Sequence, residues 1–290
     1  MHVQSDLARE CGCESSAEGI RVTSSEAEGK EILRVQIKTE EAARRIGKPC
    51  GRYVTVACRE MAGARTEEFE AMRRVLAVEI REMAERMTGK RISGDFSLLV
   101  VGVGNASMTP DALGPQTVSR LFVTRRIDPA QKRPLGECSC ELAAFSPGVT
   151  GQTGLEAAEM VRGAVMAASP DLVIAVDALA ARETAHLGVT VQLSDTGLQP
   201  GSGTGSARPA LTAQTVGVPV MALGVPTVVE SATLIGDALA RFGLDPQSPE
   251  FVDLVGNGVG FFVTPKEIDV LVPRIATLLA GAIEKAFSVL

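Results

Sequence analysis

Two short runs of branched apolar residues constrain the fold of this chain most strongly. They are SLLVV at 97–101 and LVIAV at 172–176, and neither alternates polar with apolar side chains. A strand of this kind has both faces buried, as in a parallel sheet that helices cover on both sides. The sequence therefore predicts an α/β protein with a mostly parallel sheet.

Further strands and helices alternate along the chain, which supports that fold class. Runs rich in β-branched or apolar residues predict strands at 31–37, 53–58, 189–193, 218–223 and 261–263. Apolar periodicity and capping residues predict helices within 38–48 and at 67–88, 153–168, 230–242 and 266–286. Thr153 and Glu156 form a candidate capping box for the third of these helices. We expect one α/β domain, with helices on both faces and ligand sites at the carboxyl ends of the strands.

Composition narrows the chemistry that the chain can perform. Acidic residues number 35 and basic residues 29, and the net charge of −6 argues against a broad nucleic-acid-binding surface. The chain has two histidines, His2 and His186, so mechanisms that need several imidazoles are disfavoured. No apolar run reaches the roughly 18 residues of a membrane span. We expect a protein that needs neither nucleic acid nor membrane as a partner.

The beginning of the chain and the cysteines indicate a cytoplasmic protein. Residues 1–12 lack a basic segment followed by an apolar one, so they do not resemble a secretory signal. Six cysteines in such a chain are expected to be reduced thiols. Residues 1–30 are polar and weakly periodic, which predicts a mobile or loosely docked segment.

Two aspartates follow the two apolar strands. Asp111 comes after the GVGN turn at 102–105, and Asp177 comes directly after LVIAV. An aspartate at the end of a strand can cap a helix or perform chemistry. Two of them at one edge of a parallel sheet could share a proton, with one acting as base toward water and the other as acid toward the leaving group. The glycine turn lacks the pattern of a dinucleotide site, so nucleotide binding is disfavoured.

Other motifs have simpler interpretations. The DTG tripeptide at 195–197 occurs in pepsin-like proteases, but those are all-β and use two copies. The glycine-rich loop at 200–206 is a surface loop or a lid, because no Gly-Lys-Ser/Thr follows. His186 is expected to be structural. The pairs Cys11/Cys13 and Cys138/Cys140 are expected to be free thiols rather than a zinc site.

Six motifs of uncommon sequence follow one another between residues 31 and 290. They are GNASMTPDALGP (104–115), PGVTGQTGLE (147–156), DLVIAVDALAAR (171–182), QLSDTGLQPGSGTG (192–205), GVPVMALGVPTVV (217–229) and VTPKEIDVL (263–271). In this order they resemble the germination protease, or spore protease, family of endospore-forming bacteria. The turn followed by an aspartate is also distantly similar to the hydrogenase-maturation proteases.

The resemblance implies an endopeptidase that degrades small acid-soluble spore proteins during germination. The two proposed catalytic aspartates of the family correspond to Asp111 and Asp177, and Asn105, Ser194 and Asp195 are assigned supporting roles. The pair requires no metal and no cofactor. The resemblance also implies a homotetramer in the cytoplasm of the forespore or spore core.

The family is made as a zymogen that trims its own N-terminus after an acidic residue and before a large apolar one followed by alanine. Ser5-Asp6-Leu7-Ala8 matches that order, which predicts cleavage between Asp6 and Leu7. Residues 1–6 would be a short propeptide, and 7–290 a single peptidase domain with 7–30 as a loosely ordered lead-in. The segment before Asp6 and the segment 241–261 are shorter than in other members.

Two rival functions keep the same residues. In the first, Asp111, Asp177 and Asp195 hold a metal ion through carboxylate oxygens and hydrolysis depends on that metal. In the second, the chain is a non-catalytic maturation or binding factor that captures a ligand at the strand ends. Retained activity after chelation would count against the first, and a cleaved product would exclude the second.

Overall fold

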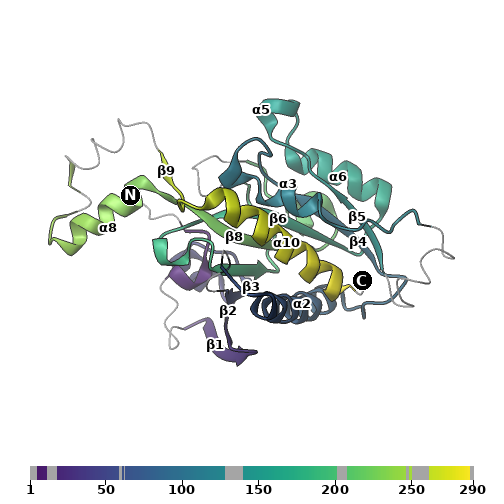
Figure 1. Cartoon of the computed structure of the whole chain (residues 1–290), viewed down its shortest axis with the longest axis horizontal. Helices are drawn as coiled ribbons and strands as arrows, with labels where there is room; N and C mark the ends of the chain where they lie inside the picture. Colours follow the sequence, from purple (N-terminus) through teal and green to yellow (C-terminus); the bar gives the residue numbers. More distant parts are fainter. Residues whose placement is uncertain are drawn as a thin grey trace.

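The computed structural model of the chain describes residues 5–11, 18–58, 61, 63–127, 140–200, 208–245, 248–249 and 261–287. Within these residues one sheet runs through the centre of the molecule, and helices lie against both of its faces (Figure 1). No helix in the described part combines the length and apolar character needed to cross a membrane. The predicted α/β class and helix-covered sheet are confirmed.

Four parallel strands form one side of the sheet. In sheet order they are β5 (Glu141–Phe145), β4 (Ser97–Gly102), β6 (Leu172–Ala181) and β8 (Val220–Glu230). Leu98 and Val100 face one helix layer, while Leu99 and Val101 face the other, and all four are buried. This two-sided burial explains why the run at 97–101 contains no polar alternation.

Antiparallel strands extend the sheet beyond β8, so the sheet as a whole is mixed. From the outer edge they are β1 (Ile20–Ala27), β2 (Lys30–Ile37), β3 (Gly51–Ala57) and β7 (Thr190–Ser194). A two-residue strand, β9 (Phe262–Val263), pairs with the last residues of β8. Parallel pairing is therefore confined to the four strands from β5 to β8, on one side of the sheet.

Residues 5–11 and 18–30, the described part of the first thirty, are more ordered than the sequence indicated. We expected 1–30 to be a mobile or loosely docked segment and 7–30 to be a loose lead-in, and for these described residues the structure differs. β1 pairs with β2 along its whole length. Leu7 and Ala8 are fully buried at the short turn η1 (Ala8–Glu10). The strand escaped prediction because most of its side chains are polar and exposed, as is common at a sheet edge.

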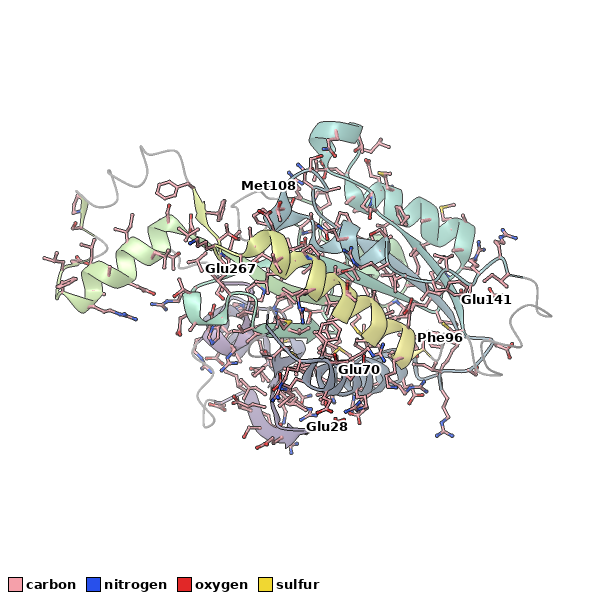
Figure 2. The ribbon with its side chains drawn as sticks, viewed as in Figure 1. Glu28, Glu70, Phe96, Met108, Glu141 and Glu267 are labelled. Carbon is pink, nitrogen blue, oxygen red and sulfur yellow. The ribbon has the colours of Figure 1, made fainter. Side chains whose placement is uncertain are left out.

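Helices occupy both faces of the sheet. One face carries α2 (Thr66–Thr88), α3 (Leu113–Val118) and α10 (Ile268–Ala286), and the other carries α6 (Ala157–Ala168) and α7 (Ala213–Val216). The remaining helices are α1 (Glu40–Ile46), the one-turn α5 (Thr150–Thr153) and α8 (Ser231–Arg241), which extends away from the body (Figure 1). Beyond the end of α10, Phe287 packs against Phe96 with ring centroids 5.5 Å apart. Phe96 is labelled in Figure 2.

Two predicted boundaries need correction. The helix expected at 153–168 begins at Ala157, because Glu156 is its cap and forms the capping box with Glu159, whereas Thr153 ends α5. The strand expected to stop before Asp177 continues to Ala181. Asp177 therefore lies inside β6, where it pairs with Gly224 of β8.

Candidate active site

A tight turn after β4 holds Asp111. Gly104 has a φ of +118°, and a Cβ at this position would lie 2.0 Å from the carbonyl oxygen of Asp111, so the turn requires glycine. The backbone N–H of Asn105 donates to Asp111 Oδ2 at 2.7 Å. Asp111 is the last residue of the short helix η2 (Thr109–Asp111), and Pro110 lies in the first turn of that helix. The aspartate is thus fixed at the carboxyl end of β4.

Asp177 lies at the point where β6 continues past its neighbour β4. Gly102 and Val176 are the last paired residues of these two strands. The Asp177 residue is only 6% exposed, and its Oδ1 accepts a hydrogen bond from the N–H of Ala178 at 2.9 Å. Burial raises the pKa of Asp177 well above its ordinary value, and the negative charge of Asp111 raises it further.

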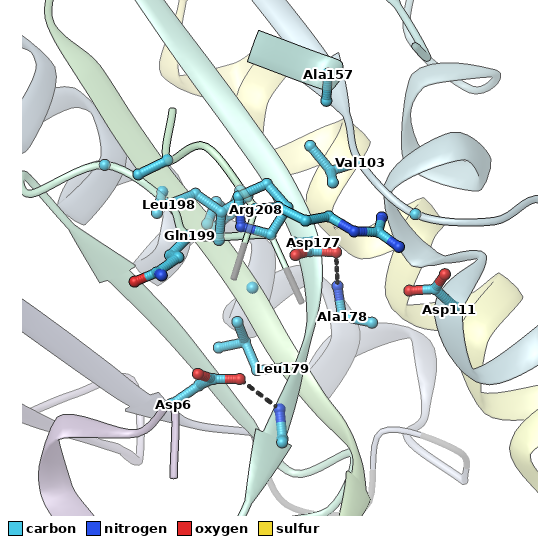
Figure 3. A pocket seen from close by; sticks show the side chains of 18 of the residues that line it. Asp6, Val103, Asp111, Ala157, Asp177, Ala178, Leu179, Leu198, Gln199 and Arg208 are labelled. Atoms are coloured by element: carbon cyan, nitrogen blue, oxygen red, sulfur yellow. Dashed lines mark hydrogen bonds between the residues drawn. The ribbon is translucent and has the colours of Figure 1, made fainter. Parts of the chain in front are cut away.

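Both carboxylates line one cavity of about 560 Å³, and Arg208 reaches over them (Figure 3). Burial also raises the pKa of Asp111, but the hydrogen bond from Asn105 and the positive charge of Arg208 oppose that shift. Asp177 consequently keeps its proton to a higher pH than Asp111. Two carboxyl groups with separated pKa values can act as a base and an acid at the same pH.

The beginning of the chain enters the same cavity. Asp6 Oδ2 accepts a hydrogen bond from the N–H of Ala180 at 2.8 Å (dashed in Figure 3). The Asp6 N–H donates to the Ala180 carbonyl at 2.9 Å. Asp6 lines the cavity beside Asp177, whose pKa its charge raises. Leu7 is fully buried in the apolar layer under α6. Of the two residues of the predicted cleavage site, Asp6 therefore lines the cavity of the aspartate pair, and Leu7 lies in the apolar core beside it.

The residues predicted to have supporting roles are placed differently from one another. Asn105 and Ser194 line the cavity. Asp195 does not, because its Oδ1 accepts the backbone N–H of Arg52 at 2.7 Å and so connects β7 to β3. Burial raises the pKa of Asp195, and the hydrogen bond from Arg52 opposes the shift. The three aspartates do not converge, and within the described residues no group of three or more candidate ligands could hold a metal ion.

The histidine and the cysteines considered in the sequence analysis do not line the cavity where they are described. His186 ends the short helix η4 (Thr184–His186), and its Nδ1 contacts Glu10. Cys11, Cys50, Cys58 and Cys140 are free thiols. Burial raises the pKa of Cys58 to about 12, so that thiol is not a nucleophile near neutral pH. His2, Cys13, Cys138 and residues 201–206 of the glycine-rich loop lie outside the described residues.

Among the residues that line the cavity, Tyr53, Gln192 and Arg208 were not recognised from the sequence as candidate site residues. The Tyr53 hydroxyl donates to the Pro49 carbonyl at 2.9 Å, and burial raises the pKa of Tyr53 to about 12. No spacing rule marks a single glutamine in a strand or an arginine after a loop. Gln192 could be found only from the sheet order, which places β7 beside β8.

Fold and site together define the class of protein. It is an α/β protein with a cleft at the carboxyl ends of parallel strands, where two carboxyl groups of different proton affinity face one cavity. A family model described as germination protease matches residues 1–245. The chain belongs to the germination protease family and is accordingly a peptidase.

Individual relatives agree with that assignment. The germination protease of Caldanaerobacter subterraneus subsp. tengcongensis is 37% identical over 309 residues, which cover 98% of this chain and 94% of that protein. For Bacillus subtilis the identity is 35% over 300 residues, with 86% and 81% covered, and for Priestia megaterium 33% over 326 residues, with 94% and 87% covered. A solved NiFe hydrogenase maturation protease, HycI from Thermococcus kodakarensis KOD1, aligns with 67% of this chain and 96% of its own at 17% identity. Its TM-score of 0.32 is too low to support an argument.

Proposed function

We propose that this chain is an atypical aspartic endopeptidase that begins the degradation of small acid-soluble spore proteins during germination. The observation that carries the proposal is the pair Asp111 and Asp177, which face one cavity, with burial raising the pKa of both and that of Asp177 the more strongly. Membership of the germination protease family supports a peptidase that acts in germinating spores. The cavity supplies an acid and a base for peptide hydrolysis.

The different environments of the two aspartates assign their roles. Ionised Asp111 takes a proton from a water molecule while the water oxygen bonds to the peptide carbonyl carbon. Protonated Asp177 then gives its proton to the leaving nitrogen as the C–N bond breaks. The two groups finish with their protonation states exchanged, and proton exchange with solvent restores them. Arg208 favours the ionised form of Asp111 at the start of the cycle.

The same pair would process the chain itself. In this proposal the chain is a zymogen that hydrolyses the bond between Asp6 and Leu7, which removes residues 1–6 and leaves 7–290 as a single domain. The support is the position of Asp6 in the cavity, with its carboxylate on the N–H of Ala180. The burial of Leu7 adds a site for the apolar residue that follows the cut.

Assembly and location complete the proposal: a homotetramer in the cytoplasm of the forespore or spore core, with no direct nucleic-acid or membrane partner. Phe242 and Leu244 are exposed just beyond the end of α8, where the helix extends away from the body (Figure 1). Exposed apolar side chains that gather in this way favour a protein interface. Light scattering should give the mass of four chains, and Phe242→Ser should reduce it.

Hydrolysis of a small acid-soluble spore protein tests the proposal. The parent should cleave it at mildly acidic pH, and Asp111→Asn and Asp177→Asn should each be slower by about 100-fold or more. Asp95→Asn, a change at an exposed aspartate, is the matched control and should keep the parent rate. Equal rates in parent and site variants would sink the assignment. Binding without any cleaved product would favour the non-catalytic alternative.

A further inference from the structure

Gln192 contacts the main chain on both sides of the proposed cleavage site. Its Nε2 donates to the carbonyl oxygen of Asp6 at 2.8 Å, and its Oε1 accepts the N–H of Ala8 at 2.7 Å. This orientation of the side-chain amide is fixed, because a carbonyl oxygen only accepts and a backbone N–H only donates. The carbonyl of Asp6 is the one that water would attack in the proposed processing.

The sheet register places Gln192 on the same face as Asp177. Gln192 of β7 pairs with Gly224 of β8, and Gly224 pairs with Asp177 of β6. Directly paired residues project to the same face, and neighbouring strands lie about 4.8 Å apart, so the two residues are about 10 Å apart across the sheet. Gly224, between them, has no side chain. The side chain of Leu179 covers this position. Gln192 and Asp177 both line the cavity, so a peptide held by Gln192 lies in the cavity that Asp177 lines.

Gln192 is suited to hold different peptides in one position. Its contacts are with main-chain groups only, so they do not depend on the side chains of the peptide. The residue is only 7% exposed, and both ends of its amide are satisfied by the N-terminal segment. A buried amide that lost these partners would need replacements from another peptide. A protein substrate that occupies the same place offers the same carbonyl and N–H.

We propose that Gln192 is a substrate-positioning residue that clamps the main chain across the scissile bond. Nε2 binds the carbonyl oxygen, and Oε1 binds the N–H of the second residue after the cut. As water adds to the carbonyl carbon, the oxygen gains negative charge and the hydrogen bond from Nε2 strengthens. The inference rests on the proposed cleavage between Asp6 and Leu7.

Two variants test the clamp through the rate at which the full chain loses residues 1–6, followed by intact mass over a range of pH. Gln192→Met removes both hydrogen bonds and should slow the loss by about 10-fold or more at every pH. Gln192→Glu keeps the shape of the side chain but cannot donate when ionised. Its rate relative to the parent should recover as the pH falls, because a protonated glutamate can donate to the Asp6 carbonyl again.

The controls separate this inference from the function on which it rests. Gln36→Met, a change on β2 outside the cavity, should leave the rate unchanged, and Asp177→Asn should abolish cleavage. Thermal unfolding verifies that each variant is folded. If Gln192→Met does not fold, the isosteric Gln192→Glu still tests the clamp. No cleavage by the parent, or cleavage by Asp177→Asn, would refute the proposed function. Parent-like rates in the Gln192 variants, or a relative rate of Gln192→Glu that does not change with pH, would refute the clamp alone.

Discussion

At the scale of single residues, Asp177 occupies a position that opposes its own ionisation. The residue is buried, and a second carboxylate, Asp111, faces the same cavity. Chemistry explains such a placement better than stability does, because a neutral residue of the same size would be more favourable there. Asp111 is less buried and is bonded to the N–H of Asn105, so it ionises more easily.

Asp177→Asn should therefore stabilise the fold at neutral pH. The folded-state pKa of Asp177 is raised, so between its ordinary and its raised value the folded chain binds a proton that the unfolded chain does not. The free energy of unfolding consequently falls as pH rises through that window. Asparagine avoids this loss, and we expect a Tm higher by about 2 °C or more at neutral pH and no gain at low pH. Thermal unfolding against pH measures it, and a destabilised variant at neutral pH would contradict the account.

Arg208→Met should move the pH dependence of hydrolysis. The positive charge of Arg208 lowers the pKa of both Asp111 and Asp177. Activity requires Asp111 ionised and Asp177 protonated, so loss of the charge should shift both limbs of the profile to higher pH. The variant should lose most activity on the acid side. Rates of peptide cleavage against pH give the shift, with the exposed Arg91→Met as control, and an unchanged profile would show that Arg208 does not act on the pair.

At the scale of elements, the site depends on how the turn after β4 packs. Gly104 brings the backbone so close to Asp111 that a Cβ has no room. The same turn supplies the N–H of Asn105, which donates a hydrogen bond to the Asp111 carboxylate. Local backbone geometry, rather than a contact between side chains, thus sets the position of the proposed base.

Gly104→Ala should abolish activity while a similar change elsewhere does not. Gly89 also has a positive φ, of +66°, but a Cβ there would meet nothing within 4 Å. Both substitutions strain the backbone at a cost of about 1–3 kcal/mol. Only the change at Gly104 also displaces Asp111, so cleavage should be lost there and kept in Gly89→Ala. Activity measured beside Tm separates the two effects, and an active Gly104→Ala would show that the turn does not position the base.

The elements that the sequence predicted well have strong local patterns. Phe69, Met72, Leu76 and Ile80 recur at helical spacing in α2, and the apolar runs of β4 and β6 led directly to Asp111 and Asp177. β5 was not predicted, because it is five residues long and only partly buried. The role inferred for Gln192 depends on pairing between strands far apart in the chain, which no local pattern reveals.

At the scale of the whole molecule, the beginning of the chain is tied to the far end of β6. The Glu10 carboxylate accepts the backbone N–H groups of Arg182 at 2.7 Å and Glu183 at 3.1 Å, and it also contacts His186. Its side chain is 1% exposed. This contact anchors the segment that places Asp6 in the cavity and Leu7 in the apolar core, although more than 170 residues separate the partners in sequence.

Glu10→Ala should release the N-terminal segment. In an Asp177→Asn background, where processing is blocked, loss of these charge-assisted hydrogen bonds should cost about 1.5–3 kcal/mol of local stability. Limited proteolysis should then cut within residues 5–11 faster than in the Asp177→Asn chain alone. Glu31→Ala, at an exposed position of β2, is the control. Equal resistance to proteolysis in both chains would show that Glu10 does not anchor the segment.

The most direct test of the aspartate pair is the intact mass of the purified full-length chain during incubation at mildly acidic pH, beside an Asp177→Asn sample. Loss of residues 1–6 from the parent alone is the predicted result, and it would show peptidase activity, the cut between Asp6 and Leu7 and the need for Asp177 together. Loss of the same mass from both samples at equal rates would contradict the claim that Asp177 takes part in the cleavage.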